Sequence, residues 1–307
     1  MKRESNGMRV ARTVRATLAL ALWAPVLGTA TLGAPAARAA SLEETVAVER
    51  GGTLRVELDV GTVDVESHDA ETVEIDADGE GFGIEFDLAQ HGDELILSGT
   101  SEGGWWQLFR GGEVRVRARV PREFSLVVAT RGGRVDVEQL QGRVDAHTTG
   151  GNIDIDRVVG PVRVRTTGGS IDATEIRGDV DAETTGGTIR IEEVRGDVGA
   201  RTAGGSIRVE DVTGKVDAET TGGSLRVTWQ GPAEGSLRTT GGSIHVEVPE
   251  GSGARLRART VGGGVDIDDE LPFSGPREHT RADGELAGGG APLELRTTGG
   301  GISIRLR

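Results

Sequence analysis

The segment TTGGSIDATEIRGDVDAE at residues 166–183 is followed directly by TTGGTIRIEEVRGDVGAR at residues 184–201, so the chain nearly repeats itself after eighteen residues. Each copy contains a pair of glycines, and such pairs begin at Gly132, Gly150, Gly168, Gly186, Gly204 and Gly222. With looser spacing the series continues at Gly241, Gly262 and Gly299. A fixed period of this kind indicates a protein built by stacking one small structural unit many times.

Each copy contains two short stretches in which apolar and polar residues alternate. In one copy the apolar positions, with a final threonine, are Ile153, Ile155, Val158, Val162, Val164 and Thr166. Alternation predicts half-buried strands, and the recurring glycines between them predict tight turns, with a positive φ at some of them. Two strands and two turns describe one coil of a β-solenoid, whose coils stack by parallel pairing about 4.8 Å apart.

The predicted fold is therefore all-β: a single-stranded, right-handed parallel β-solenoid with two-strand coils of eighteen residues, preceded by an N-terminal excursion of β-strands. The expected hand follows from the general preference for right-handed parallel crossovers. A thin interior is expected, because the later strand of several coils has a small inward residue: Ala146, Ala182, Ala200 and Ala218. The closing sequence ISIRLR, residues 302–307, is predicted to be a protected terminal strand.

Residues 1–39 have the pattern of a signal peptide. Three arginines precede an apolar stretch, and Ala37-Arg38-Ala39 matches the small-residue cleavage site, so the mature chain is expected to begin near Ala40. Pro25 interrupts the apolar stretch, which favours cleavage over a permanent membrane anchor. We therefore expect an exported protein, periplasmic or secreted and associated with the cell surface, with no stable membrane span after cleavage.

The mature chain is expected to have two regions. Residues 40–128 form an N-terminal β region, with an early coil at 53–66 and inserted strands at 67–112. The early coil is inferred because LRVELDVGTVDVES, which starts at Leu54, aligns without gaps on the segment that starts at Leu126. Residues 129–307 contain the solenoid repeats, with an insertion at about 266–292.

The composition of the chain limits the classes of partner that it can bind. The formal net charge is −14, which argues against nucleic acid and anionic membrane surfaces as partners, since both attract basic proteins. There is no cysteine, and therefore no disulfide. The chain contains 50 glycines and only 3% aromatic residues, a composition typical of a repetitive β architecture and unusual for the core of a globular enzyme.

Stacking turns positions one coil apart into columns on the surface. The outward column of the first strand contains three acids, then Arg190, Arg208 and Arg226, then His245; the acids are Asp136, Asp154 and Asp172. This stripe is either solvated surface or a binding stripe for a zwitterionic or polysaccharide ligand, with the three arginines as candidate binding residues. On the second strand the signs alternate through Arg165, Glu183, Arg201 and Glu219, a pattern that predicts a structural charge ladder.

One segment, SEGGWWQLFRGG at residues 101–112, differs from the repeats because it gathers aromatic side chains. Trp105, Trp106 and Phe109 either form a plug that caps the open end of the core or an exposed tip that contacts a glycan or a protein partner. Tryptophan rings supply much binding energy in a small area, so these residues are candidate binding residues.

The sequence does not indicate a metal, a cofactor or a reaction. Its five histidines are scattered without metal-ligand spacing, and Ile153 stands where a calcium-binding β-roll requires glycine. There is no nucleophile elbow of the G-x-S-x-G type. The enzymatic alternative is a carbohydrate-active enzyme on a β-helix, similar to polysaccharide lyases or hydrolases. A close cluster of acids with an arginine in a concave groove would favour that alternative.

Three features resemble the bacterial "putative adhesin" β-solenoid family, a domain of unknown function. They are the T-x-G-G-x-I-x-I repeats, the junction VRVRARVPREFSLVVATRGGRVDVEQLQG at 114–142 and the ending GELAGGGAPLELRTTGGGISIRLR. The resemblance covers residues 45–307 and implies a non-catalytic role in the cell envelope or at the surface. The expected function is a non-enzymatic structural or interaction module that presents a rigid, repetitive β surface to an envelope polysaccharide or a protein partner.

Overall fold

The computed structural model describes residues 41–79, 83–101 and 114–307. The expected signal peptide, residues 1–39, lies outside the described residues, as do Trp105, Trp106 and Phe109. All regular secondary structure in the described ranges is β-strand. No helix in those ranges is long and apolar enough to cross a membrane.

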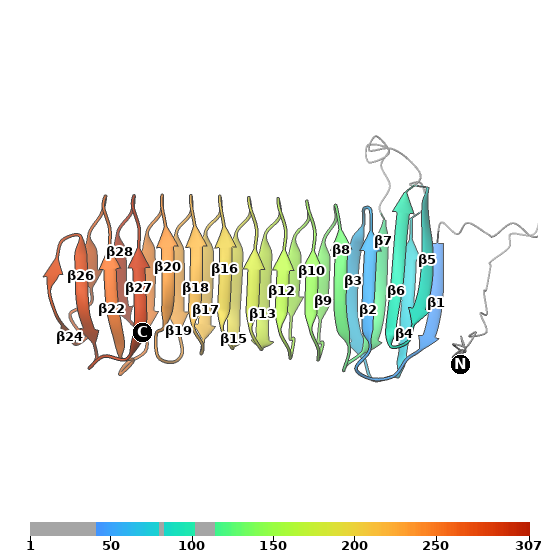
Figure 1. Cartoon of the computed structure of the whole chain (residues 1–307), viewed down its shortest axis with the longest axis horizontal. Helices are drawn as coiled ribbons and strands as arrows, with labels where there is room; N and C mark the ends of the chain where they lie inside the picture. Colours follow the sequence, from blue (N-terminus) through green and yellow to red (C-terminus); the bar gives the residue numbers. More distant parts are fainter. Residues whose placement is uncertain (1–40, 80–82, 102–113) are drawn as a thin grey trace, which may run out of the picture. The chain divides into compact units, whose positions relative to one another are not determined.

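The described strands form two long sheets that face each other (Figure 1). Sheet A contains thirteen of them, in spatial order β1 (Ser41–Ala47), β4 (Thr72–Asp78), β7 (Arg115–Pro121), β3 (Thr62–His68), β9 (Val135–Glu138), β11 (Ile153–Asp156), β13 (Ile171–Arg177), β15 (Ile189–Arg195), β17 (Ile207–Val212), β19 (Leu225–Trp229), β21 (Ile244–Val248), β28 (Ile302–Leu306) and β23 (Val265–Ile267).

Sheet B contains the other fifteen described strands. Their spatial order is β24 (Phe273–Ser274), β26 (Arg281–Leu286), β22 (Ala254–Arg259), β27 (Ala291–Arg296), β20 (Gly235–Thr239), β18 (Val216–Thr220), β16 (Val198–Thr202), β14 (Val180–Glu183), β12 (Val162–Arg165), β10 (Val144–His147), β8 (Ser125–Thr130), β2 (Thr53–Leu58), β6 (Glu94–Ser101) and β5 (Ile84–His91). The last strand, β25 (Arg277–Glu278), pairs with β26 off this path.

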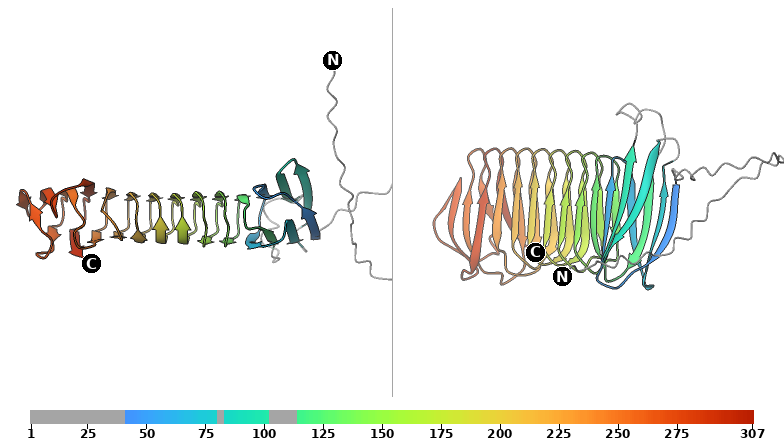
Figure 2. Two further views of the ribbon diagram at one scale, coloured as in Figure 1. Left: turned by 90° about the horizontal axis from the view of Figure 1, so that it is seen from below. Right: turned by 45° about the vertical axis from the view of Figure 1, so that its right-hand side comes forward.

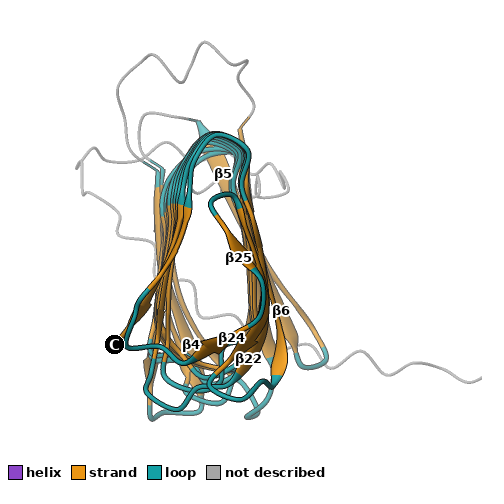
Figure 3. Cartoon of the chain, turned by 90° about the vertical axis from the view of Figure 1, so that its left-hand side faces the viewer, coloured by secondary structure: helices purple, strands orange, loops and turns teal. Residues whose placement is uncertain are grey.

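From β8 to β21 the chain alternates between the sheets, so that each coil gives one strand to each of them. Residues eighteen apart pair in parallel: Val144 with Val162 in sheet B, and Ile153 with Ile171 in sheet A. Figure 2 shows the two sheets as two rows of strands, and Figure 3 shows the turns that join them. The prediction of an all-β chain with parallel strands in long, stacked sheets is confirmed.

An apolar core fills the space between the sheets. The inward residues of every coil are buried; Ile153 and Ile171, for example, are fully inaccessible. Burying such a side chain is worth about 1.5–3 kcal/mol, and in this fold neighbouring coils provide the burial, because one coil cannot cover its own interior. Trp229 is also fully buried, and its Nε1–H donates a hydrogen bond of 3.2 Å to the Gly214 carbonyl.

The glycine pairs exist because backbones approach each other closely. A Cβ at Gly187, the second glycine of its pair, would lie 1.9 Å from the Gly169 carbonyl oxygen of the preceding coil. At Gly186 the nearest backbone atom would be 3.6 Å away. The expected positive φ occurs at turn glycines such as Gly160 and Gly178, but not at Gly187. At Gly187 glycine is therefore required for its missing side chain and not for its φ, whereas Gly133, the second glycine of the first pair, also has a positive φ of 110°.

A threonine two residues before the glycine pair joins successive coils at every pair from Gly150 onward. Thr184 is 3% exposed, and its hydroxyl donates to the Gly169 carbonyl of the preceding coil over 2.8 Å. The hydroxyl oxygen of Thr184 also accepts a hydrogen bond from the Gly187 N–H over 3.3 Å. Equivalent pairs of bonds are made by Thr148, Thr166, Thr202, Thr220, Thr239, Thr260 and Thr297. The repeated T-x-G-G motif is thus a clamp between coils.

In five coils a left-handed residue in or directly after the sheet A strand changes which side chains point inward. Strict alternation would leave Val158 pointing outward, but Arg157 has a φ of 55° and Val158 is fully buried. The same conformation recurs at Gln139, Glu175, Glu193 and Asp211, with φ between 56° and 59°. A left-handed conformation costs a residue with a side chain about 1–3 kcal/mol, so burial of the next apolar residue must offset it.

Near the N-terminal end of the stack, the strand order differs from the chain order. The coil of β2 and β3 lies between the coil of β8 and β9 and the strands β6 and β7. Leu54 pairs with Leu126, and Val63 pairs with Val135, which is the register that the gapless alignment of these segments predicts. Beyond β6 and β7, the strands β1, β4 and β5 pair antiparallel with their neighbours.

The C-terminal coil also departs from chain order. Strand β27 pairs in parallel with both β20 and β22, and β28 pairs with both β21 and β23 (Figure 1). The threonine clamps give the same order, because Thr297 donates to the Gly242 carbonyl and Thr260 donates to the Gly300 carbonyl. The prediction that ISIRLR is a terminal strand is therefore wrong. As an interior strand, β28 has backbone partners on both edges, and β23 ends the sheet.

Candidate binding surfaces

The structure assembles the predicted outward column on sheet A. Asp136 pairs with Asp154, and Asp154 pairs with Asp172, on neighbouring strands. The column then continues through Arg190, Arg208, Arg226 and His245. The acids and the arginines therefore occupy two successive blocks of one stripe, as the repeat predicts. At its end, burial and the charges of Arg226 and Arg305 lower the pKa of His245.

Each of the three predicted arginines lies beside a glutamate in the neighbouring outward column, two residues further along the strand. The guanidinium–carboxylate distances are 3.4 Å for Arg190 and Glu192, 3.0 Å for Arg208 and Glu210, and 3.3 Å for Arg226 and Glu247. The arginine side chains are 40–56% exposed. Because a guanidinium has five N–H donors, each arginine keeps donors for a ligand, although its charge is largely balanced.

The acidic half of the stripe is held together by Arg134. Its Nε lies 2.9 Å from a carboxylate oxygen of Asp136 and 2.9 Å from one of Asp154. Burial raises the pKa of Asp136 to about 6, with Arg134 opposing the shift and the charges of Asp154 and Asp64 adding to it. Burial and the charge of Asp154 also raise the pKa of Asp172. Asp136 is therefore the carboxyl group of this face that is most readily protonated near neutral pH.

These acids project from a strand face and do not line a cleft built by loops. Their coils follow one another every eighteen residues with no inserted segment to form a wall around them. Within the ranges that the structure describes, no group of three or more acidic or histidine side chains is arranged to hold a metal ion. The enzymatic alternative requires a cluster of acids with an arginine in a concave groove. The stripe contains such a cluster, but no groove surrounds it.

Sheet B carries a hollow of about 490 Å³ that the sequence analysis did not identify. In the outward column of this sheet, Gly199 stands between Asp181 and Asp217. A Cβ at Gly199 would lie 3.3 Å from Asp181 Oδ1 with no backbone atom closer, and its φ is not positive. Neither the turn nor coil stacking therefore demands glycine here, and its missing side chain leaves the surface hollowed.

The hollow has charged walls of both signs. Its lining includes four cations, Arg143, Arg163, Arg201 and Lys215, and four acids, Asp179, Asp181, Asp197 and Asp217. Two of the acids are fixed by backbone contacts, since Asp179 accepts from the Asp197 N–H and Asp197 accepts from the Lys215 N–H, each over 2.9 Å. A hydrogen bond from Lys215 to Asp217 raises the pKa of that lysine.

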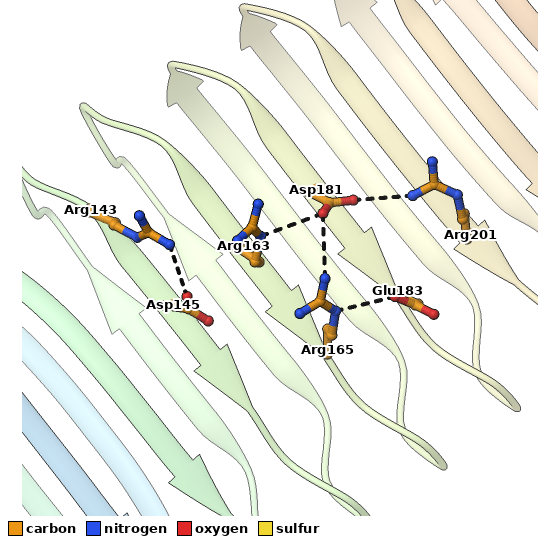
Figure 4. A network of polar contacts seen from close by, with 7 residues as sticks. All are labelled: Arg143, Asp145, Arg163, Arg165, Asp181, Glu183 and Arg201. Carbon is orange, nitrogen blue, oxygen red and sulfur yellow. Dashed lines mark hydrogen bonds and ion pairs between the residues drawn. The ribbon is translucent and has the colours of Figure 1, made fainter.

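Asp181 is the centre of the ion-pair network on this face (Figure 4). Its carboxylate lies 3.6 Å from Arg163, 3.8 Å from Arg165 and 3.4 Å from Arg201. Arg165 also contacts Glu183 over 3.2 Å, and the strand register runs from Arg165 through Glu183 and Arg201 to Glu219. The predicted column of alternating charge is present, but of its neighbouring pairs only Arg165 and Glu183 are in contact among the ion pairs described, and Arg201 contacts Asp181 instead. The chemistry of this face, fixed donors beside fixed acceptors, suits a ligand rich in hydroxyl groups.

The two copies of the repeat at residues 166–183 and 184–201 contain a sequence signal for the hollow. The first copy reads GDVDAE where the second reads GDVGAR, so Asp181 is replaced by Gly199 at an outward strand position. Glycine in a strand weakens it unless something approaches closely. Trp105, Trp106 and Phe109 lie outside the described residues, so the structure does not place them relative to this hollow or to the stripe on sheet A.

Comparison with known proteins gives a family and a set of solved structures. The Toastrack DUF4097 family model matches residues 53–305. No curated protein matches the chain.

Similar solved structures include a "putative cell adhesion protein" from Clostridium sporogenes, at 10% identity and a TM-score of 0.23, covering 87% of this chain and 100% of that chain. A "putative adhesin" from Bacteroides fragilis matches at 10% identity and a TM-score of 0.32, covering 87% and 97%. Another from Parabacteroides merdae matches at 10% and 0.25, covering 86% and 96%. With identities of 10% and TM-scores below 0.5, these matches carry no argument about function.

Proposed function

We propose that this chain, which belongs to the Toastrack DUF4097 family, is an exported, non-enzymatic interaction module that presents a rigid, repetitive β surface to a glycan or protein partner of the cell envelope. In this proposal the signal peptide of residues 1–39 is removed, and the mature chain acts in the periplasm or at the cell surface. Its coils of eighteen residues form a right-handed solenoid over residues 129–307, with an insertion at 266–292, and residues 40–128 form the N-terminal β region.

The Gly199 hollow is the observation that carries the proposal. Its walls are side chains on, or directly before, strands that are fixed on both edges by parallel pairing, and Asp179 and Asp197 are held further by backbone N–H groups. A surface ordered before binding loses little conformational entropy when a ligand arrives, so modest contacts can give useful affinity. An envelope polysaccharide, with many hydroxyl groups, matches this mixture of donors and acceptors.

The residues singled out in the sequence supply further contacts in this proposal. Arg190, Arg208 and Arg226 offer their remaining N–H donors along sheet A, and Trp105, Trp106 and Phe109 offer an aromatic tip. The three arginines lie on sheet A and do not line the hollow on sheet B. The partner would therefore be engaged by more than one face, as expected for an adhesin-like module.

A carbohydrate-active enzyme is the second candidate, favoured by one observation. Asp136, with its pKa raised to about 6, stands directly beside Asp154 on neighbouring strands. Strands of one sheet lie about 4.8 Å apart, close to the separation of about 5–5.5 Å between the two carboxyl groups of a retaining glycosidase. The raised pKa suits a general acid, and Asp154 would be the nucleophile. A cleft that orients a sugar is the part this candidate lacks on the described face.

Co-sedimentation tests the proposed function. The purified protein is mixed with fractionated peptidoglycan, envelope polysaccharide and membranes from the host. Gly199→Gln fills the hollow without a change of charge, and Thr174→Gln makes a similar addition on the face of sheet A as a control. We expect binding to one fraction that Gly199→Gln weakens and Thr174→Gln does not. Absence of binding to every fraction would contradict the proposal.

A further inference from the structure

A column of four arginines lies on sheet B near the C-terminal end of the stack. Arg238 pairs with Arg296, Arg296 pairs with Arg259, and Arg259 pairs with Arg281. Neighbouring strands are about 4.8 Å apart, so four guanidinium groups follow one another along the stack. Like charges at this spacing repel, and such a column is unexpected in a chain whose net charge is −14.

The interposed last coil creates this column. Strand β27 carries Arg296 and enters the sheet between β20, which carries Arg238, and β22, which carries Arg259 (Figure 1). If the coils followed chain order, Arg238 and Arg259 would be neighbours and Arg296 would lie beyond them. The chain therefore returns from its outermost coil and places a third positive charge between two others.

Three of the four arginines form one side of a groove of about 360 Å³. Arg238, Arg296 and Arg259 line it together with the outward residues of the turns that follow, which are Thr221, Thr240, Thr298 and Val261. Val261 is 77% exposed, the more prominent of the two exposed large apolar side chains among the described residues. A row of guanidinium groups thus runs beside a row of hydroxyl groups, with an apolar contact at one end.

The positive charge of the arginine column is only partly balanced. Glu294 contacts both Arg238 and Arg296, and Asp283 contacts both Arg259 and Arg281. In the ion pairs described, four guanidinium groups therefore share two carboxylates, whereas Arg190, Arg208 and Arg226 on sheet A each have a glutamate of their own. The arginine side chains in the column remain 47–52% exposed, so their free donors face solvent.

We propose that this groove binds a carboxylated polysaccharide that lies along the stack. A guanidinium fork matches a carboxylate with two parallel hydrogen bonds, and a polymer of uronic acids offers one carboxylate on each sugar. The turn threonines can exchange hydrogen bonds with the sugar hydroxyls, and Val261 can pack against a sugar face. The inference rests on the proposed function for its source of ligand, since an envelope partner would provide such a polymer.

The lining favours a glycan over a nucleic acid. Single-stranded nucleic acids are held by aromatic side chains on which the bases stack, and the groove is lined by arginine, threonine, glutamate and valine. Sugars that carry both carboxylates and hydroxyl groups fit a row of guanidinium groups beside a row of threonine hydroxyls better.

Equilibrium binding of polygalacturonate to the purified protein tests this inference. The triple variant Arg238→Gln/Arg259→Gln/Arg296→Gln removes the column. Its control, Arg117→Gln/Arg119→Gln/Arg122→Gln, removes three exposed, ion-paired arginines near the other end of the stack. Circular dichroism and thermal unfolding establish that both variants fold. Neutral dextran, polyphosphate and single-stranded DNA serve as competing ligands.

We expect the protein to prefer polygalacturonate to the other three polymers, and salt to weaken the binding. Each exposed charge pair is worth roughly two- to threefold in affinity, so the triple variant should bind about tenfold more weakly, and the control should change by less than about twofold. The inference is overturned if polygalacturonate does not bind, if polyphosphate or DNA binds more tightly, or if the control loses as much affinity as the triple variant.

The result of the polygalacturonate experiment can be distinguished from the result of the co-sedimentation experiment that tests the proposed function. If the protein co-sediments with an envelope fraction and does not bind polygalacturonate, the groove assignment fails and the interaction role stands. If it binds polygalacturonate through the arginine column and no envelope fraction, the groove assignment stands and the envelope role fails.

Discussion

At the residue scale, the second glycine of each pair is the position with the least tolerance. A methyl group at Gly187 would overlap the Gly169 carbonyl, whereas at Gly186 it would have room. Because overpacking a tight contact costs about 1–3 kcal/mol, Gly187→Ala should lower the unfolding free energy by that amount or more. Gly186→Ala, the matched control, should change it by less than about 0.5 kcal/mol. Urea denaturation of both variants measures this, and equal losses would refute the assignment of the close contact to Gly187.

The threonine clamp makes a second prediction at this scale. Thr184→Val keeps the shape of the side chain and removes the hydroxyl that joins the Gly169 carbonyl to the Gly187 N–H. Leaving buried polar groups without partners costs about 1–3 kcal/mol, so the unfolding free energy should fall by that amount. Thr185→Val, at the exposed neighbour, is the control and should be nearly neutral. If the two valine variants unfold alike, the clamp does not stabilise the stack.

Asp136 predicts a pH dependence of stability. Its pKa is raised from 3.8 to about 6 in the folded chain, so the folded protein holds this proton more tightly than the unfolded chain does. The stabilising effect is complete below about pH 3.8 and is lost as the pH rises to about 6. Asp136→Asn should therefore gain stability relative to the wild type between pH 4 and pH 7, by about 1–2 kcal/mol for a partly exposed group. Denaturation at several pH values measures the difference, and a difference independent of pH would contradict the raised pKa.

At the scale of the elements, the eighteen-residue period was enough to predict which strands pair in the central coils. Ile171 with Ile189 and Val180 with Val198 are in the register that the repeat requires. The order of the terminal coils could not be predicted in this way. A segment long enough to leave the stack and return can place the next coil on either side of its predecessor, and the inward pattern of ISIRLR suits both positions. Two-sided backbone pairing, which is a property of the assembled sheet, decides between them.

Disulfide trapping distinguishes the two orders of the last coils, and the native chain contains no cysteine to interfere. In the structure Ser303 pairs directly with His245 on one side and with Asp266 on the other. A His245→Cys/Ser303→Cys pair should therefore oxidise readily, because neighbouring strands bring Cα atoms within the range of a disulfide. A His245→Cys/Asp266→Cys pair, two strands apart at about 10 Å, should not. Mass spectrometry after mild oxidation reads both results, and the reverse pattern would show that the coils follow chain order.

At the scale of the whole molecule, the sequence predicted the repetitive architecture and the charged columns but not where its surface is hollowed. Arg190, Arg208 and Arg226 stack as expected because they lie in coils of equal length. The hollow on sheet B depends on the absence of a side chain at Gly199, one residue among many glycines that serve tight packing. The arginine groove depends on the interposed coil. The order of the repeats in the sequence therefore does not predict that Arg296 lies between Arg238 and Arg259.

The central claim is that the protein binds an envelope partner without changing it chemically, through a surface that is ordered before binding. The measurement that tests this most directly is equilibrium binding of the purified protein to fractionated envelope polysaccharide, with mass spectrometry of the polysaccharide before and after incubation. We predict saturable binding that Gly199→Gln weakens, and a polymer of unchanged length. Shortened chains or new chain ends that disappear with Asp136→Asn would contradict the claim and would establish the carboxyl pair on sheet A as the site of a reaction.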